Sequence, residues 1–151
     1  MPPVEPLDVR IESVLKIFIQ ELAEKTGTTT SGIARDLAWV GAGVAKAGGI
    51  EVVGPFGLRR PLARLDLGES RDRLVIRLED DLARELERVF RRNVRGALRE
   101  AIRLGTFAVQ PQDLRMRGPL GIERPFAELR LPEMRDEKVR EALRRLQRAG
   151  R

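Results

Sequence analysis

The strongest constraint on the fold of this chain is that part of its sequence occurs twice. Residues 54–65 (GPFGLRRPLARL) return as residues 118–129 (GPLGIERPFAEL), with seven of twelve positions identical at an offset of 64. The same offset aligns Gly41 with Gly105. Self-similarity at a fixed spacing is typical of a structural unit built more than once. We therefore expect each copy to contain the same elements in the same order.

Two further alignments define the extent of each copy. Ser31–Leu37 aligns with Arg95–Ala101 at the offset of 64, whereas Leu7–Ile11 aligns with Leu74–Leu78 at an offset of 67. The second copy therefore lacks three residues between these two segments. We expect the missing residues to fall at a turn.

The pattern of each copy predicts a strand followed by two helices. Apolar residues alternate with others in residues 7–11 and 74–78, which is the period of a strand with one buried face. A helix follows each strand, and in the second copy it begins near Asp80. The second helices are expected over about Ser31–Ala45 and Val94–Leu104.

Hairpin arms and a tail complete the chain. Residues 50–53 and 114–117 are extended segments that enter the repeated Gly-Pro-x-Gly turns, so each copy is expected to end in a hairpin arm. The unduplicated tail, Pro132–Arg148, has apolar residues at i, i+4 and i+7. This spacing predicts a short helix with a basic outer face.

The helix expected after the first strand is apolar almost all round, which predicts that it is covered on more than one side. We expect Val14 and Ile17 to be buried by the tail helix or by another subunit. The apolar residues of this helix are Val14, Leu15, Ile17, Phe18, Ile19 and Leu22.

The junction between the two helices has clear turn residues only in the first copy. Gly27 can end the first helix in a left-handed conformation, and one residue of Thr28–Thr30 can cap the next helix. The second copy lacks this glycine, and Asn93 is its only turn-like residue. Within the second helix of the first copy, Gly41 and Gly43 predict close packing against another helix.

Composition excludes many kinds of site. The chain has no histidine, cysteine or tyrosine, which rules out His/Cys zinc sites, thiolate or Ser-His-Asp catalysis, and disulfides. Its carboxylates form no cluster at metal or acid/base spacing. We therefore expect no enzyme activity, no metal and no cofactor. No apolar run approaches a membrane span and the N-terminus does not resemble a leader, so a cytoplasmic location and no membrane partner are expected.

The charge balance favours an anionic partner. Lys+Arg 29 against Asp+Glu 23 gives a net charge of +6, and residues 71–151 carry 21 basic and 14 acidic side chains against 8 and 9 in residues 1–70. Arginine supplies 25 of the 29 cations. Arginine suits bidentate contacts to phosphates and bases, although a GC-rich genome or a thermophile's growth temperature would also enrich it.

The order strand, helix, turn, helix, with PLDVRIESVL followed by ELAEKTG and SGIARDL, resembles the ribbon-helix-helix (Arc/MetJ/CopG-like) family of DNA-binding proteins. The second copy resembles it in RLVIRLEDDL and LREAI but lacks the turn glycine. The likeness covers about residues 6–45 and 72–105. It implies that the two strands pair as an antiparallel ribbon over a shared core, which duplication supplies within one chain.

The resemblance also implies which residues would contact DNA. In the family the ribbon lies in the major groove and the N-termini of the second helices bind phosphates. Carried over by position, the outward ribbon residues are Pro6, Asp8, Arg10, Arg73, Val75 and Arg77. Those expected at phosphates are Thr29, Thr30, Ser31, Asn93 and Arg95. Arg59, Arg60 and Arg124, beside the Gly-Pro-x-Gly turns, can add backbone contacts, on grounds of charge alone.

Chemistry assigns separate roles to the outward residues. Arg10, Arg73 and Arg77 can make bidentate contacts to guanine, and Val75 can meet a thymine methyl. Asp8 and Pro6 depart from what an anionic groove favours. Asp8 can accept from cytosine N4 or hold a neighbouring arginine, and it is also compatible with a ribbon that no longer touches DNA.

These observations predict an α+β, mostly helical chain. It comprises repeat 1 (residues 1–67), repeat 2 (residues 71–131) and a C-terminal helix (residues 132–151), with the repeats forming a pseudo-dimer and each followed by a short β-hairpin arm. The expected function is binding of double-stranded DNA by a transcriptional regulator or chromatin-type protein.

Two alternatives stay open at this point. One is an antitoxin-like or scaffold protein that binds a protein partner or a second copy through the tail. The other is a winged-helix DNA binder, in which Gly27 marks a helix-turn-helix and residues 50–67 form the wing. Salt-sensitive retention on DNA would separate DNA binding from the protein-binding alternative.

Overall fold

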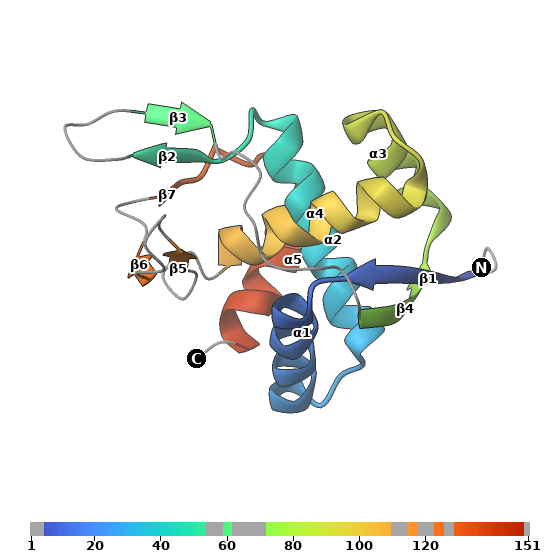
Figure 1. Ribbon diagram of the computed structural model, residues 1–151. Helices are drawn as coiled ribbons and strands as arrows, with labels where there is room; N and C mark the ends of the chain where they lie inside the picture. Colours follow the sequence, from blue (N-terminus) through green and yellow to red (C-terminus); the bar gives the residue numbers. More distant parts are fainter. Residues whose placement is uncertain are drawn as a thin grey trace.

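The computed structural model describes residues 5–53, 59–61, 72–109, 115–117, 123–125 and 129–149. Within them the chain is α+β and mostly helical, and the order strand, helix, helix occurs twice (Figure 1). The helices are α1 (Ser13–Thr26), α2 (Thr30–Lys46), α3 (Asp80–Phe90), α4 (Val94–Val109) and α5 (Glu137–Ala149). The strands are β1 (Glu5–Ile11), β2 (Glu51–Val53), β3 (Arg59–Pro61), β4 (Asp72–Leu78), β5 (Arg115–Arg117), β6 (Glu123–Pro125) and β7 (Leu129–Arg130).

β1 and β4 pair as a two-stranded antiparallel ribbon. The register is centred on Asp8, which lies opposite Val75, and these two residues are separated by the strand offset of 67. Alternation buries Val9, Ile11 and Ile76 against the helices, as the period of two predicts. The prediction of strands at residues 7–11 and 74–78 is confirmed.

The centre of the core is a close crossing of α2 and α4 (Figure 1). A Cβ added to Gly41 would lie 1.8 Å from the carbonyl oxygen of Ala101, and one added to Gly105 would lie 2.1 Å from that of Leu37. The two contacts are reciprocal, because an offset of 64 converts Gly41 to Gly105 and Leu37 to Ala101. Glycine is therefore required at both positions to bring the backbones together.

The turns between the paired helices have the same length in both halves. Gly27 ends α1 with φ 66° and Arg91 ends α3 with φ 53°, so an arginine occupies the left-handed position that glycine fills in the first half. Thr29 caps α2, and its Oγ1 accepts from the Gly32 N–H at 3.0 Å. Asn93 caps α4 in the same way, and its Oδ1 accepts from Gly96 N–H at 2.9 Å.

The expectation that the missing residues fall at a turn is wrong. Each turn has three residues, whereas α1 has 14 residues and α3 has 11. The deletion therefore shortens the first helix. Removal of three residues takes out nearly one helical turn of 3.6 residues, which leaves the buried stripe almost in phase.

α5 packs mainly on α2 and less on α1. Its residues Val139, Ala142 and Leu146 are buried, and the Arg145 guanidinium makes two hydrogen bonds to the Asp36 carboxylate, at 2.8 and 3.2 Å. This pairing raises the pKa of Arg145 above its ordinary value. The tail is thus a covering helix, and it begins at Glu137, after an irregular segment from residue 131.

A second ion pair joins α5 to α3. The Lys138 Nζ donates to the Asp81 carboxylate at 2.8 Å, and this hydrogen bond lowers the pKa of Asp81 and raises that of Lys138. Lys138 also lies over the ring of Trp39, 5.1 Å from its centroid. Trp39 is only partly buried.

The prediction that the tail helix buries Val14 and Ile17 is wrong. Val14 is 46% exposed and Ile17 is 54% exposed, because α5 docks along α2 rather than over this face of α1. The opposite face of α1 carries Leu15, Ile19 and Leu22 into the core. Burial of the two exposed residues by another subunit stays a prediction.

The arms pair as expected within the strands that the structure describes. β2 pairs with β3 and β5 pairs with β6, each antiparallel. β7 adds to the free edge of β2, so the first arm belongs to a three-stranded sheet, which the sequence pattern did not predict. The Gly-Pro-x-Gly turns themselves lie outside the described residues.

Substitution of Gly41 or Gly105 by alanine tests the helix crossing. Because the added methyl would overlap a backbone carbonyl, we expect each variant to lose more than about 2 kcal/mol of unfolding free energy. Chemical denaturation measures this loss. Gly96→Ala is the matched control, since its added Cβ meets no backbone atom but only the side chains of Asn93 at 3.3 Å and Arg92 at 3.5 Å, and it should change stability by less than about 1 kcal/mol. Equal effects in all three variants would contradict the close crossing.

Substitution of Arg91 by glycine tests the left-handed turn. An L-residue in this conformation costs about 1 kcal/mol, so we expect Arg91→Gly to raise the unfolding free energy by up to that amount. The mirror experiment is Gly27→Ala, which should lower stability by about as much. Denaturation midpoints at equal m-value measure both changes, and a destabilising Arg91→Gly substitution would argue against the geometry.

Candidate nucleic-acid interface

One face of the β1–β4 ribbon is turned away from the helices and carries the six residues expected there. Arg10, Arg73 and Arg77 are all exposed, and Val75 is 56% exposed between them. We call this surface the ribbon face; its residues are Pro6, Asp8, Arg10, Arg73, Val75 and Arg77.

Two arginines lie opposite each other at one end of the ribbon face, and one carboxylate lies beside them. Arg10 lies directly opposite Arg73, and like charges in this position repel. Asp8, one step along the same face, reduces the repulsion because its carboxylate accepts a hydrogen bond from the Arg73 Nη2. The other oxygen, Asp8 Oδ1, is shielded from solvent and has no hydrogen-bond partner among the described residues. The geometry therefore fits Asp8 as a holder of Arg73 better than as a contact to cytosine.

The N-terminus of α2 is attached to the edge of the ribbon. The Arg77 backbone N–H donates to the Ser31 Oγ at 2.8 Å, and the Arg35 guanidinium donates to the Arg77 carbonyl at 3.4 Å. Ser31 thus has a structural role, but its own hydroxyl proton stays available to donate to an anion. Thr29 uses its oxygen as the helix cap, and Thr30 is half-buried beside it.

The N-terminus of α4 is the more basic of the two. Arg91, Arg92 and Arg95 are exposed around its first turn, whose cap is Asn93. α4 also contacts β1, as α2 contacts β4. Helix N-termini favour anions because their first N–H groups have no intrahelical partner. The expected phosphate positions of both halves therefore lie at the starts of two helices that contact the ribbon.

Two residues outside the predicted site, Arg35 and Glu12, also form contacts next to the ribbon. Arg35 follows Ser31 by one helical turn, a spacing that could have indicated a shared target. Glu12, the residue before α1, is 2% exposed and forms a buried ion pair with Arg103, which also donates to Glu100 at 2.9 Å. No local pattern indicates that pair, because its members are 91 residues apart.

The helix-turn-helix alternative requires α2 to enter a groove. α2 instead contacts all four other described helices and β4, and eight of its residues are buried. Of the residues of α2, only Lys46 is exposed. This packing favours the ribbon over α2 as the element that would contact DNA, and the winged-helix interpretation stays an alternative.

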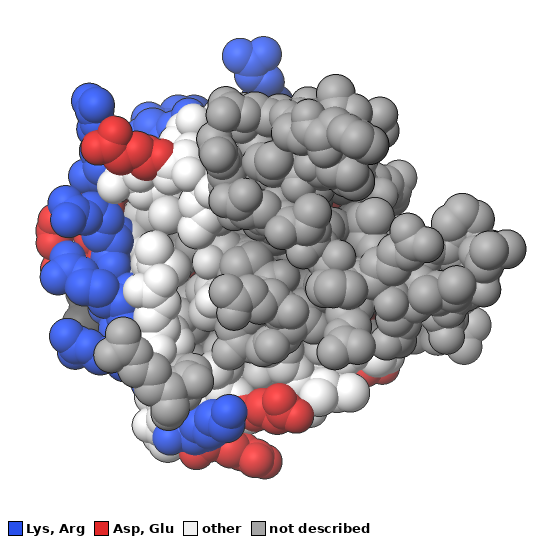
Figure 2. Space-filling model, turned by 90° about the vertical axis from the view of Figure 1, so that its left-hand side faces the viewer, with Lys and Arg blue, Asp and Glu red and all other residues white. Residues whose placement is uncertain are grey.

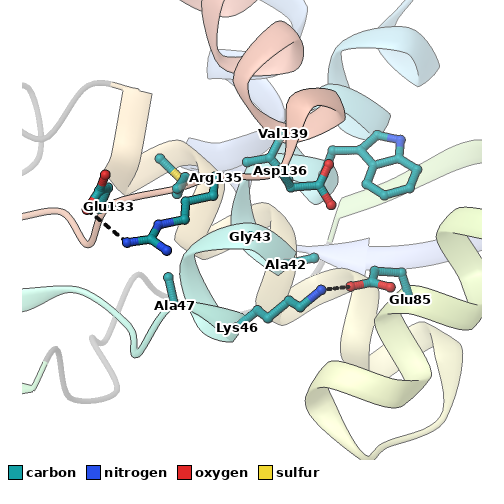
Figure 3. A pocket seen from close by; sticks show the side chains of 11 residues that line it. Ala42, Gly43, Lys46, Ala47, Glu85, Glu133, Arg135, Asp136 and Val139 are labelled. Atoms are coloured by element: carbon teal, nitrogen blue, oxygen red, sulfur yellow. Dashed lines mark ion pairs between the residues drawn. The ribbon is translucent and has the colours of Figure 1, made fainter.

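A separate hollow of about 470 Å³ lies between α2, α3 and the segment before α5 (Figure 3). Its lining includes Trp39 and Val139. Both cations that line it are ion-paired: Lys46 with Glu85 at 3.7 Å and Arg135 with Glu133 at 3.9 Å. This pairing makes the hollow a poor site for a polyanion.

Positive charge is not confined to the ribbon. Figure 2 views the molecule from the side of the arms, and lysine and arginine gather along its left-hand edge with acidic side chains among them. In the part of the chain that the structure describes, no group of three or more acidic residues could hold a metal ion. None of the described helices is both long and apolar enough to cross a membrane.

Comparison with protein-family models, with curated proteins and with solved structures finds no match to this chain.

Substitution of Ser31 by alanine tests the attachment of α2 to the ribbon. Since the Arg77 N–H would lose its acceptor, we expect a loss of about 0.5–1.5 kcal/mol in unfolding free energy and faster hydrogen exchange at that amide. Thr30→Ala is the neighbouring control and should leave the Arg77 amide protected. Unchanged exchange at Arg77 in Ser31→Ala would show that the hydrogen bond contributes nothing.

Proposed function

We propose that this protein binds double-stranded DNA, with the ribbon face in the major groove and the N-termini of α2 and α4 at flanking phosphates. The single observation that carries the proposal is the ribbon face itself: three exposed arginines in register on one face, with no acidic residue there except Asp8. A transcriptional regulator or a chromatin-type protein would have this activity.

We further propose that the two halves form a ribbon-helix-helix-like pseudo-dimer within one chain. Two sets of reciprocal contacts support it. In the pairing of β1 with β4, the offset of 67 converts each residue pair into a pair of the same register. At the helix crossing, the offset of 64 converts the contact of Gly41 with Ala101 into the contact of Gly105 with Leu37. Such reciprocity is expected of an isologous, two-fold interface. Both sets come from segments that the sequence repeat aligns.

The ribbon arginines suit the major groove for chemical reasons. Arginine can donate two parallel hydrogen bonds to the O6 and N7 atoms of guanine, and valine can pack on the methyl group of thymine. A two-stranded β-ribbon fits the width of the groove. The first-turn N–H groups of α2 and α4, with Arg95, would then fix the register on the backbone without selecting sequence.

Protein binding is the second candidate, because one apolar surface lacks cover in the described chain. Val14 and Ile17 lie one turn apart on the outer side of α1 and are about half exposed. A protein partner or a second copy that covers them is compatible with DNA binding. An antitoxin-like role through α5 has less support, since the apolar side of α5 is already buried on α2.

The double substitution Arg73→Ala/Arg77→Ala tests the proposed function. Each lost bidentate contact should cost about 1–3 kcal/mol at a preferred sequence, so duplex affinity should fall by tenfold or more. Fluorescence anisotropy with a duplex selected from a random pool measures the change, and a salt titration separates phosphate from base contacts.

The control is Arg84→Ala/Arg140→Ala, which removes the same charge from exposed positions on α3 and α5. It should retain most of the affinity, with only the small loss expected from net charge. Equal affinity of the two double variants would contradict the ribbon as the contact surface. Absence of salt-sensitive duplex binding by the natural protein would contradict the proposed function altogether.

A further inference from the structure

The ribbon face is symmetric in its backbone but not in its side chains. The strand offset relates Pro6 to Arg73, Asp8 to Val75, and Arg10 to Arg77. Only the last of these three pairs has the same residue twice. A homodimeric ribbon must present identical residues from both strands, whereas one chain that contains both strands is free of this requirement.

The difference places unlike chemistry at the two ends of the face. At one end Arg10 lies opposite Arg73, and at the other Arg77 lies opposite Pro6, which has no side-chain hydrogen-bond donor. The ends are separated by four residues along a strand, or about 13 Å. That distance is close to four base-pair steps of about 3.4 Å each. Two arginines can therefore contact bases at one end and one arginine at the other.

The centre of the face is also unlike on its two strands. Asp8 lies opposite Val75, so a carboxylate and an exposed apolar side chain flank the local two-fold axis. The Asp8 carboxylate holds Arg73, the residue without an equivalent on β1. Arginine has five donors, so this contact fixes the direction of the guanidinium and leaves other N–H groups for a base. Arg73, whose counterpart on β1 is Pro6, is therefore also the arginine whose direction Asp8 fixes.

We propose that one chain of this protein recognises a non-palindromic duplex sequence, in which the guanine contacted by Arg73 has no symmetric counterpart and Asp8 acts as the positioning residue for Arg73. The proposal rests on the proposed function, since it requires the ribbon face to lie in the major groove. Operators of two-fold proteins mirror the symmetry of the protein, and here the symmetry is broken at two of three positions.

Selection of duplexes from a random library tests the proposal. We expect the natural protein to enrich a non-palindromic motif, and the symmetrised variant Pro6→Arg/Asp8→Val to enrich a more palindromic one. Both substitutions lie on the outward face, and thermal melting verifies that the variant folds. In the natural protein, Arg73→Ala should relax the preference at one base pair by about tenfold or more and leave the other positions unchanged.

The positioning role of Asp8 has a separate readout. Asp8→Asn removes a negative charge, so binding to random duplex should tighten, while the ratio of specific to random binding should fall severalfold because Arg73 is less firmly held. A merely structural role would lower both affinities together. That outcome would overturn Asp8 as the positioning residue.

The outcomes separate this inference from the function on which it rests. A palindromic motif selected by the natural protein would overturn the inference and leave DNA binding intact. Tight duplex binding with no enriched motif would also overturn it, since the ribbon would then not contact bases specifically. Failure to bind any duplex in a salt-dependent manner would instead remove the proposed function.

Discussion

The pairing of β1 with β4 is the constraint on which the rest of the structure depends. A single strand beside two helices would leave one row of backbone N–H and C=O groups and one apolar side uncovered. Antiparallel pairing joins the first half of the chain to the second and allows α2 and α4 to cross at Gly41 and Gly105. Their backbones approach so closely that even a methyl group has no room. A shift of the strand register would therefore also shift α2 against α4 at this close crossing.

The same pairing creates the candidate site. Because alternate residues of each strand are buried, the remaining ones form an outward face whose composition the core does not control. Arg10 and Arg73 are forced into opposition there, and Asp8 reduces the repulsion. The attachment of Ser31 to the Arg77 backbone fixes the start of α2 at the ribbon edge. Arg77, one of the outward arginines, and the start of α2 are thus joined by direct contacts, as the proposed DNA binding requires.

α5 and the arms distinguish the two halves. α5 covers α2 through Val139 and Leu146 and is fixed by the ion pair between Arg145 and Asp36. β7 joins the first arm, so the end of the second copy closes on the first. Two of the three pairs of corresponding outward residues of β1 and β4 also differ, since they do not pack in the core and nothing there requires them to match.

The sequence by itself determined the order strand, helix, helix in each half, the buried alternation of the ribbon and a helix cap within Thr28–Thr30, because these depend on local period and local hydrogen bonding. It also predicted which ribbon residues face outward. Tertiary structure alone decided that the deletion shortens α3, that Arg91 replaces a glycine, and that Val14 and Ile17 lie uncovered. It also decided the contacts of Asp8 with Arg73 and of Glu12 with Arg103. These contacts join residues far apart in the chain. Each charged group has several possible partners, and only the three-dimensional arrangement decides which of them lies within reach.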